Sequence, residues 1–247
     1  MLGIGRGIRA CLFDLDGVLT QTAKVHAAAW KCTFDEFLRR RAQERGDDFV
    51  PFDAVGDYEA YVDGKPRHDG VASFLASREI ELAQGKVDDP PAAQTVHGLG
   101  NRKNELVLAM IHKDGVEAYH GSVRYVRAVR EAGLPRAVVS SSSNCRDVLE
   151  AAGIEDLFDA IVDGVSAERE HLKGKPAPDT FLAGARALAV EPAGAAVFED
   201  ALAGVEAGRA GGFGFVVGVD RLGQADALRA HGADVVVGDL AELLERG

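Results

Sequence analysis

The sequence predicts an α/β fold in which a doubly wound parallel sheet is interrupted by an all-helical insert. A short apolar run with β-favouring residues, 8–13, comes first, and the residues from 23 to about 113 then read as helix after helix. After residue 115, short apolar strands alternate with helices, which requires a parallel sheet covered on both faces. Because the first run reads as a buried strand, we expect it in that same sheet, so that the insert divides one domain.

The insert begins with a helix over residues 23–41, because its apolar residues recur at spacings of three and four. Further helices are separated by loops that carry glycine and proline, at 63–66 and 88–91. We therefore predict an α/β core domain at residues 1–21 and 117–247, and a helical domain at residues 22–116.

The second half supplies the remaining elements of the core. A valine stripe predicts a helix that stops at Gly133, with Pro135 just beyond. Asn144 can cap the helix that follows it. The predicted strands are 136–140, 160–162, 195–198, 213–219 and 234–237, and the other predicted helices are 145–152 and 178–188.

Composition excludes several classes of function. The chain has 247 residues, of which 47% are hydrophobic, and this is enough for a sizeable core. Its formal charge of −11 would repel nucleic acid and anionic lipid. The three cysteines show no metal-binding or disulfide spacing, and no apolar run approaches the length of a membrane span. We expect a cytoplasmic monomer with no nucleic-acid or membrane partner. Cys145, at a helix start, is either a thiol of lowered pKa or a packed side chain.

Polar residues follow four of the predicted strands. Asp14 and Asp16 end the first strand and could, taken alone, be two solvated acids. Further candidates follow later strands, where carboxyl ends of parallel strands meet at one edge. Clustered carboxylates favour Mg²⁺, while lysine and serine beside such an ion are ligands for a phosphoryl group. The later candidates are Ser140, Ser141, Lys175, Glu199 and Asp200.

These residues lie in four ordered motifs, Asp14-Leu15-Asp16-Gly17-Val18, Ser140, Lys175-Pro176 and Glu199-Asp200. In this the chain resembles the haloacid dehalogenase superfamily, and within it the β-phosphoglucomutase-like subfamily. The resemblance implies a Rossmann-like core with a helical cap. It also implies that Asp14 is a nucleophile that becomes an aspartyl-phosphate and Asp16 a general acid and base. Mg²⁺ would be held by Asp14, the Asp16 carbonyl and Asp200, with Glu199 close by, and phosphoryl oxygens by Ser140, Ser141 and Lys175.

A second set of residues that resembles this family lies in the helical insert. Residues 64–67 resemble a loop that holds the non-transferring phosphate, and residues 101–104 resemble a substrate loop. The resemblance implies that a sugar phosphate would be bound by His26, Trp30, Arg67, Lys103 and Asn104. His26 could instead lie satisfied at the edge of the core, and Lys103 on a solvated face. Gly98-Leu99-Gly100 is a weak phosphate-loop signal, because no strand precedes it.

The resemblance implies a phosphosugar mutase that interconverts β-glucose 1-phosphate and glucose 6-phosphate through a bisphosphate. A phosphatase of the same fold, in which water takes the phosphoryl group, is the second hypothesis. A binding module without activity is the third, although the complete set of nucleophile, acid, lysine and metal ligands argues against it. Ser141 and Ser143 stand where the family more often has alanine and a basic residue.

Overall fold

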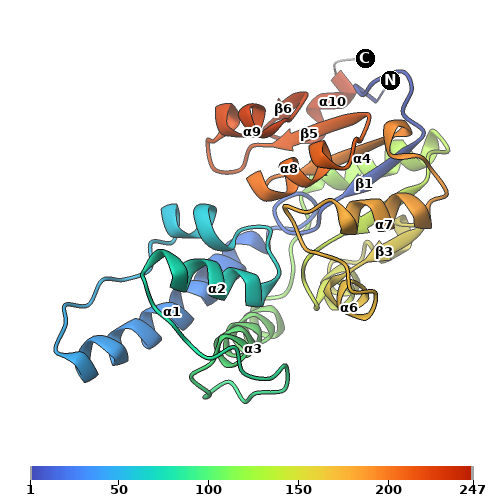
Figure 1. Ribbon diagram of the computed structural model, residues 1–247. Coiled ribbons are helices and arrows are strands. Elements are labelled where there is room, and N and C mark those ends of the chain that lie inside the picture. Colours follow the sequence, from blue (N-terminus) through green and yellow to red (C-terminus); the bar gives the residue numbers. More distant parts are fainter. Residues whose placement is uncertain (1, 246–247) are drawn as a thin grey trace. The chain divides into compact units, whose positions relative to one another are not determined.

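The computed structural model describes residues 2–245 and divides the chain into two compact units (Figure 1). The core unit comprises Met1–Gln21 with Val116–Gly247, and the helical unit comprises Thr22–Gly115. The sequence places the second junction one residue later, between 116 and 117. Each unit has a hydrophobic core of its own.

A parallel sheet of six strands forms the centre of the core unit, in the order β3-β2-β1-β4-β5-β6. β1 lies in the middle, between β2 and β4, so the predicted fold and the place of the first strand are confirmed. The winding changes direction between β1 and β4, and sheets of this kind bind ligands beyond the carboxyl ends of such strands. The strands are β1 (Ala10–Phe13), β2 (Arg136–Val139), β3 (Ala160–Val162), β4 (Ala195–Glu199), β5 (Phe215–Val219) and β6 (Val235–Val237).

Helices cover both faces of this sheet (Figure 1). Alternate residues of β1 point to opposite faces: Leu12 belongs to the core under α7, α8 and α9, whereas Phe13 stacks on Phe198 at 4.4 Å and meets Tyr125 of α4 edge-on. The helices are α4 (His120–Glu131), α5 (Cys145–Ala151), α6 (Gly164–Arg169), α7 (Asp179–Ala187), α8 (Leu202–Ala210), α9 (Ala225–His231) and α10 (Glu242–Glu245), with short 3₁₀ turns η2 (Glu155–Leu157) and η3 (Pro192–Gly194).

The helical unit packs around aromatic rings. Phe34 stacks on Trp30 at 5.1 Å between ring centroids and contacts Phe52 and Phe74 at 5.1 and 4.2 Å. Its elements are α1 (Ala23–Arg45), a π-helical turn η1 (Tyr58–Val62), α2 (Arg67–Ser77) and α3 (Val96–Asp114). The irregular stretch before α3 is longer than the predicted loop at 88–91, since residues 78–95 hold no helix.

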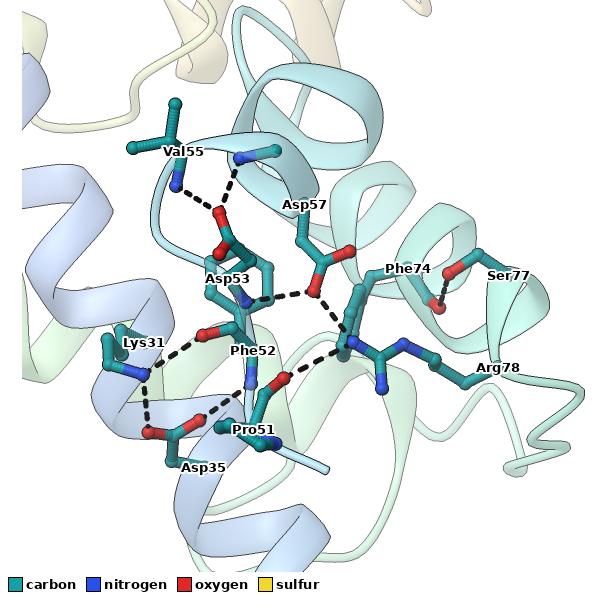
Figure 2. A network of polar contacts seen from close by, with 11 residues as sticks. Lys31, Asp35, Pro51, Phe52, Asp53, Val55, Asp57, Phe74, Ser77 and Arg78 are labelled. Atoms are coloured by element: carbon teal, nitrogen blue, oxygen red, sulfur yellow. Dashed lines mark hydrogen bonds and ion pairs between the residues drawn. The ribbon is translucent and has the colours of Figure 1, made fainter. Parts of the chain in front are cut away.

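A network of polar contacts ties the segment before η1 to two helices (Figure 2). Asp35 of α1 accepts from the Phe52 N–H at 2.8 Å and from Lys31 at 2.9 Å, and Lys31 also donates to the Phe52 carbonyl. Asp57 accepts from Arg78, which follows α2, at 2.7 Å. Because both backbone groups of Phe52 are bonded, its ring is held against the aromatic core.

Two local predictions about the start of α5 have clear outcomes. Asn144 occupies the N-cap position, yet its side chain makes no capping hydrogen bond, because its backbone is not in the extended conformation that capping requires. The Cys145 thiol is buried, and burial with nearby carboxylates raises its pKa. The alternative of a lowered pKa is therefore wrong, and Cys145 is a packed side chain.

Across residues 2–245, no helix has the combination of length and apolar character that crossing a bilayer requires. Cys11, Cys32 and Cys145 are all free thiols.

Phe52→Ala should destabilise the helical unit by about 3–5 kcal/mol, since a ring that is 1% exposed is replaced by a cavity. Urea unfolding followed by circular dichroism measures the change. Val55→Ala, in the same segment but 59% exposed, is the matched control and should stay within about 0.5 kcal/mol of the parent. Equal loss in both variants would contradict the packing role of Phe52.

Candidate active site

The ends of β1 and β4 place two acids side by side. Phe13 is paired with Phe198 in the sheet, and the Asp14 N–H donates to the Phe198 carbonyl at 2.9 Å. The side chains of Asp14 and Glu199 therefore leave neighbouring strands at the same edge. This is the edge at which the sheet order predicts a ligand site.

The ammonium group of Lys175 lies between these two acids. Its Nζ donates to Asp14 Oδ1, lies 2.6 Å from Glu199 Oε1, and donates to the Val139 carbonyl at 3.2 Å. The side chain is fully buried, and the Phe181 ring of α7 faces the Nζ with its centroid 4.9 Å away. A buried charge is stable only when it is paired, so these contacts fix the loop that carries Lys175 to both strands.

A third carboxylate completes an acidic cluster. Oxygens of Asp14, Glu199 and Asp200 all lie within 4.8 Å of one another, and the three residues are buried. Burial raises the pKa of Asp14, Lys175 opposes this rise, and the neighbouring Glu199 and Asp16 add to it. Three carboxylates against one ammonium leave an excess of negative charge, which a bound cation would relieve. The set of oxygen donors suits a hard divalent ion.

Two glycines make room for these carboxylates. Gly17 has a φ of +85°, and a Cβ built on it would lie 1.7 Å from Asp200 Oδ2. A Cβ on Gly204 of α8 would lie 1.8 Å from Glu199 Oε1. Any side chain at either position would displace a member of the cluster. The glycine after Asp16 therefore serves the site as well as the turn.

Asp16 and the two candidate serines lie around this cluster with different exposure. Asp16 is half-buried in the turn after β1, which the Gly17 N–H closes on the Thr20 carbonyl at 2.8 Å. Ser140 is buried directly after β2, and its Oγ accepts from the Ser142 N–H at 3.0 Å. Ser141, beside it, is half-buried. Both serines thus follow a strand, as the sequence predicts, and in the structure that strand lies next to β1.

Three of the candidate residues in the helical unit form one contact group. Lys103 of α3 donates to His26 Nδ1 of α1 at 3.0 Å, and its Nζ lies 5.0 Å from the centroid of the Trp30 ring. Lys103 is only 6% exposed, so the alternative of a solvated face is wrong. Asn104, next to it on α3, is half-buried.

Arg67 is the first residue of α2 and packs on α3. A Cβ on Gly100 would lie 2.6 Å from His68 Cδ2 and 3.6 Å from Arg67 Cγ. A Cβ on Gly98 would lie 2.2 Å from the Ala93 carbonyl. Both glycines lie inside α3 and permit close packing. The Gly-Leu-Gly sequence is therefore explained by packing and not by a phosphate loop.

Comparison with known proteins assigns the chain to a family. The family model of haloacid dehalogenase-like hydrolases matches residues 8–212, a range that includes every candidate site residue. The chain belongs to this family. The β-phosphoglucomutase of Mycobacterium bovis is 58% identical over 99% of this chain and 94% of that protein, and that of Bacillus subtilis is 32% identical over 96% and 92%.

A solved structure agrees with these relatives. The β-phosphoglucomutase of Clostridium difficile has a TM-score of 0.75 and 26% identity, covering 96% of this chain and 93% of that one. The resemblance seen in the sequence is thus confirmed: the chain is an enzyme of the β-phosphoglucomutase-like branch of the haloacid dehalogenase family.

The structure adds residues that the motifs of this family did not suggest. Arg221 Nε donates to the Gly17 carbonyl at 2.7 Å, and its guanidinium lies 3.6 Å from the centroid of the Tyr119 ring. Gln224 donates to the Asp200 carbonyl at 3.3 Å. Both come from the loop after β5, which holds the backbone of the candidate metal ligand Asp200 and of Gly17, the residue after Asp16. No local pattern marks them, because their partners lie far away in the chain.

Gly17→Ala should lower stability by several kcal/mol, because it combines the cost of a positive φ, about 1–2 kcal/mol, with the displacement of the Asp200 carboxylate. Gly133→Ala is the matched control, since Gly133 has a φ of +74° with nothing within 4 Å of its Cβ position. Denaturant unfolding of both variants measures the difference. A loss in Gly17→Ala no larger than in the control would contradict the close approach of Asp200.

Proposed function

We propose that the chain is a Mg²⁺-dependent phosphosugar mutase that interconverts β-glucose 1-phosphate and glucose 6-phosphate through an aspartyl-phosphate and a bisphosphate. One observation carries the proposal: in a chain 58% identical to a β-phosphoglucomutase, Asp14, Lys175, Glu199 and Asp200 meet at the carboxyl ends of β1 and β4. The substrate is therefore a small sugar phosphate. The cytoplasmic location and the monomeric state stay predictions.

Asp14 would be the group that accepts and returns the phosphoryl group. In its phosphorylated form it transfers that group to the 6-hydroxyl of β-glucose 1-phosphate, which gives the 1,6-bisphosphate and a free Asp14 carboxylate. The bisphosphate then presents its other end, and Asp14 takes the phosphoryl group from O1, which leaves glucose 6-phosphate. Lys175, bonded to Asp14, holds the carboxylate in place and offers positive charge to the phosphoryl oxygens.

Asp16 would move the proton in both half-reactions. It takes the proton of the 6-hydroxyl as the oxygen attacks phosphorus, and gives that proton to O1 as the bond from phosphorus to O1 breaks. Its half-exposed position in the turn after β1 supports this role, because a proton carrier must reach the substrate. Ser140 and Ser141 would bind the phosphoryl oxygens from the end of β2.

Mg²⁺ would be held by Asp14, the Asp16 carbonyl and Asp200, with Glu199 close by. The buried cluster of three carboxylates fits this ion, because it offers several oxygen donors and its negative charge exceeds the single positive charge of Lys175. When bound, the ion neutralises charge on the phosphoryl oxygens. The residues of the helical unit would recognise the sugar and the phosphate that is not transferred, through Arg67, Lys103, Asn104, His26 and Trp30.

Mg²⁺ should stabilise the parent protein against heat, since ligand at a hundred times its dissociation constant contributes about 2.7 kcal/mol. Asp200→Asn should lose most of this stabilisation, because one carboxylate of the cluster is neutralised. Differential scanning calorimetry with and without Mg²⁺ measures both. Asp226→Asn, at a carboxylate whose side chain is fully exposed, is the control and should respond as the parent does. An unchanged Mg²⁺ response in Asp200→Asn would contradict the proposed ligand set.

The mutase reaction is tested with Mg²⁺, β-glucose 1-phosphate and a trace of the bisphosphate, following glucose 6-phosphate and free phosphate in the same sample. We expect glucose 6-phosphate as the dominant product. Asp14→Asn should lower turnover by at least about a thousandfold, as expected when a nucleophile is removed, while Asp226→Asn keeps it. If Asp14→Asn forms glucose 6-phosphate at the parent rate, the assignment of Asp14 as the nucleophile is refuted.

The alternative function is hydrolysis of sugar phosphates, which the description of the matching family as hydrolases favours. In that case water would take the phosphoryl group from Asp14, and free phosphate would dominate in the same assay. The two functions share Asp14, Asp16 and Lys175, so the ratio of the two products decides between them.

A further inference from the structure

A pair of histidines joins α2 to α3 beside Arg67. His68 Nε2 lies 3.4 Å from Arg67 Nε and 3.2 Å from His97 Nδ1, and the two imidazole rings are 3.9 Å apart between centroids. His68 also shares a side-chain hydrogen bond with Asn101, one turn of α3 beyond His97. The first turn of α2 and the first turns of α3 are therefore connected through one imidazole.

The contact with Arg67 decides which nitrogen of His68 carries the proton. An arginine Nε–H can only donate, so His68 Nε2 is the acceptor. In the contact between His97 Nδ1 and the same nitrogen, at 3.2 Å, His97 is then the donor, so two donors share the single lone pair of His68 Nε2. His68 is consequently neutral, with its proton on Nδ1.

Asn101 accounts for the remaining nitrogen. Its amide group donates to the carbonyls of Val87 and Asp89, each at 2.9 Å, so its oxygen remains as the acceptor for the Nδ1–H of His68. Every polar atom of the His68 ring thus has a partner of the right kind. The same Asn101 fastens the irregular stretch before α3.

We propose that His68 is a positioning residue that holds the Arg67 guanidinium against α3, in the orientation that binds the phosphate which is not transferred. The proposal rests on the role given to Arg67 in the proposed function. The contact with His68 engages Nε, so a bound phosphate would be met by the terminal nitrogens of the guanidinium. Because the partner is a neutral imidazole, it adds no negative charge beside the anion.

The charges around His68 keep it neutral. Burial, the neighbouring His97 and Arg67 lower the pKa of His68 to about 4. The acidic residue Asp89 interacts with His97. A histidine whose folded pKa is lowered loses stabilisation as the pH falls from about 6.5 to about 4, since the unfolded chain takes up the proton first. At neutral pH the link between Arg67 and α3 is therefore intact.

A double-mutant cycle on bisphosphate binding tests the proposal. All variants carry Asp14→Asn to prevent turnover, and calorimetry gives the dissociation constant of β-glucose 1,6-bisphosphate. Arg67→Ala should raise it at least about tenfold, and His68→Phe about fivefold, the size expected for the net contribution of one ordinary hydrogen bond. In the Arg67→Ala background, His68→Phe should change it less than about twofold, because its effect passes through Arg67.

Matched variants separate positioning from packing. His68→Gln places an oxygen acceptor near the position of Nε2 and should recover most of the affinity, whereas His68→Asn reaches only the position of Nδ1 and should not. His112→Phe, at an exposed position on α3, should bind as the parent does. A recovery by asparagine as complete as that by glutamine would overturn the role of Nε2.

Long-range proton–nitrogen spectra of the histidine rings test the tautomer in the parent protein, with the His68 signals assigned by their loss in His68→Gln. A proton on Nε2 would overturn the proposal, as would equal effects of His68→Phe with and without Arg67. If Arg67→Ala leaves binding unchanged, both the Arg67 role and this inference fail. The cycle needs no turnover, so a failure of the mutase assay is a separate result.

Discussion

The buried ammonium of Lys175 is the contact on which the site of this protein depends. It joins the end of β1 through Asp14, the end of β4 through Glu199 and the end of β2 through the Val139 carbonyl. An unpaired charge at this depth would cost several kcal/mol, so the loop that carries Lys175 can adopt only the conformation that brings the acids together. The central position of β1 in the sheet makes this possible, since both of its neighbours end beside Asp14.

The acids pack so closely that the backbone beneath them must lack side chains. Gly17 lies under Asp200 and Gly204 under Glu199, so the glycines that follow both acidic motifs have the same purpose. One ammonium does not balance the three carboxylates of this cluster. The pKa of Asp14 is raised first by burial and then by Glu199 and Asp16, although Lys175 opposes the rise. The core unit is thus built with a deficit of positive charge at the position where a divalent ion would complete it.

The sequence was informative where a local pattern fixes the structure. Alternation of strand and helix predicted the sheet, and the strand ends predicted which polar residues would meet, because parallel strands end at a common edge. Arg221 and Gln224 escaped prediction, since each stabilises the site through a backbone carbonyl far away in the chain and follows no spacing. The Gly-Leu-Gly sequence at 98–100 predicts a phosphate loop only weakly, because no strand precedes it. In the structure the two glycines are explained by the close approach of Ala93 and His68.

Three cations among the candidate binding residues, Lys175, Lys103 and Arg67, have hydrogen-bond partners of different charge. Lys175 is paired with carboxylates, which cancel its charge and suit a site that receives a metal ion. Lys103 donates to the imidazole of His26, and Arg67 to that of His68, and a neutral imidazole orients a cation while leaving its charge intact. A group that must attract a phosphate from water needs that charge, because a carboxylate partner would repel the anion. A histidine instead of an aspartate beside Arg67 and beside Lys103 therefore agrees with the proposed role of the helical unit in binding a phosphate.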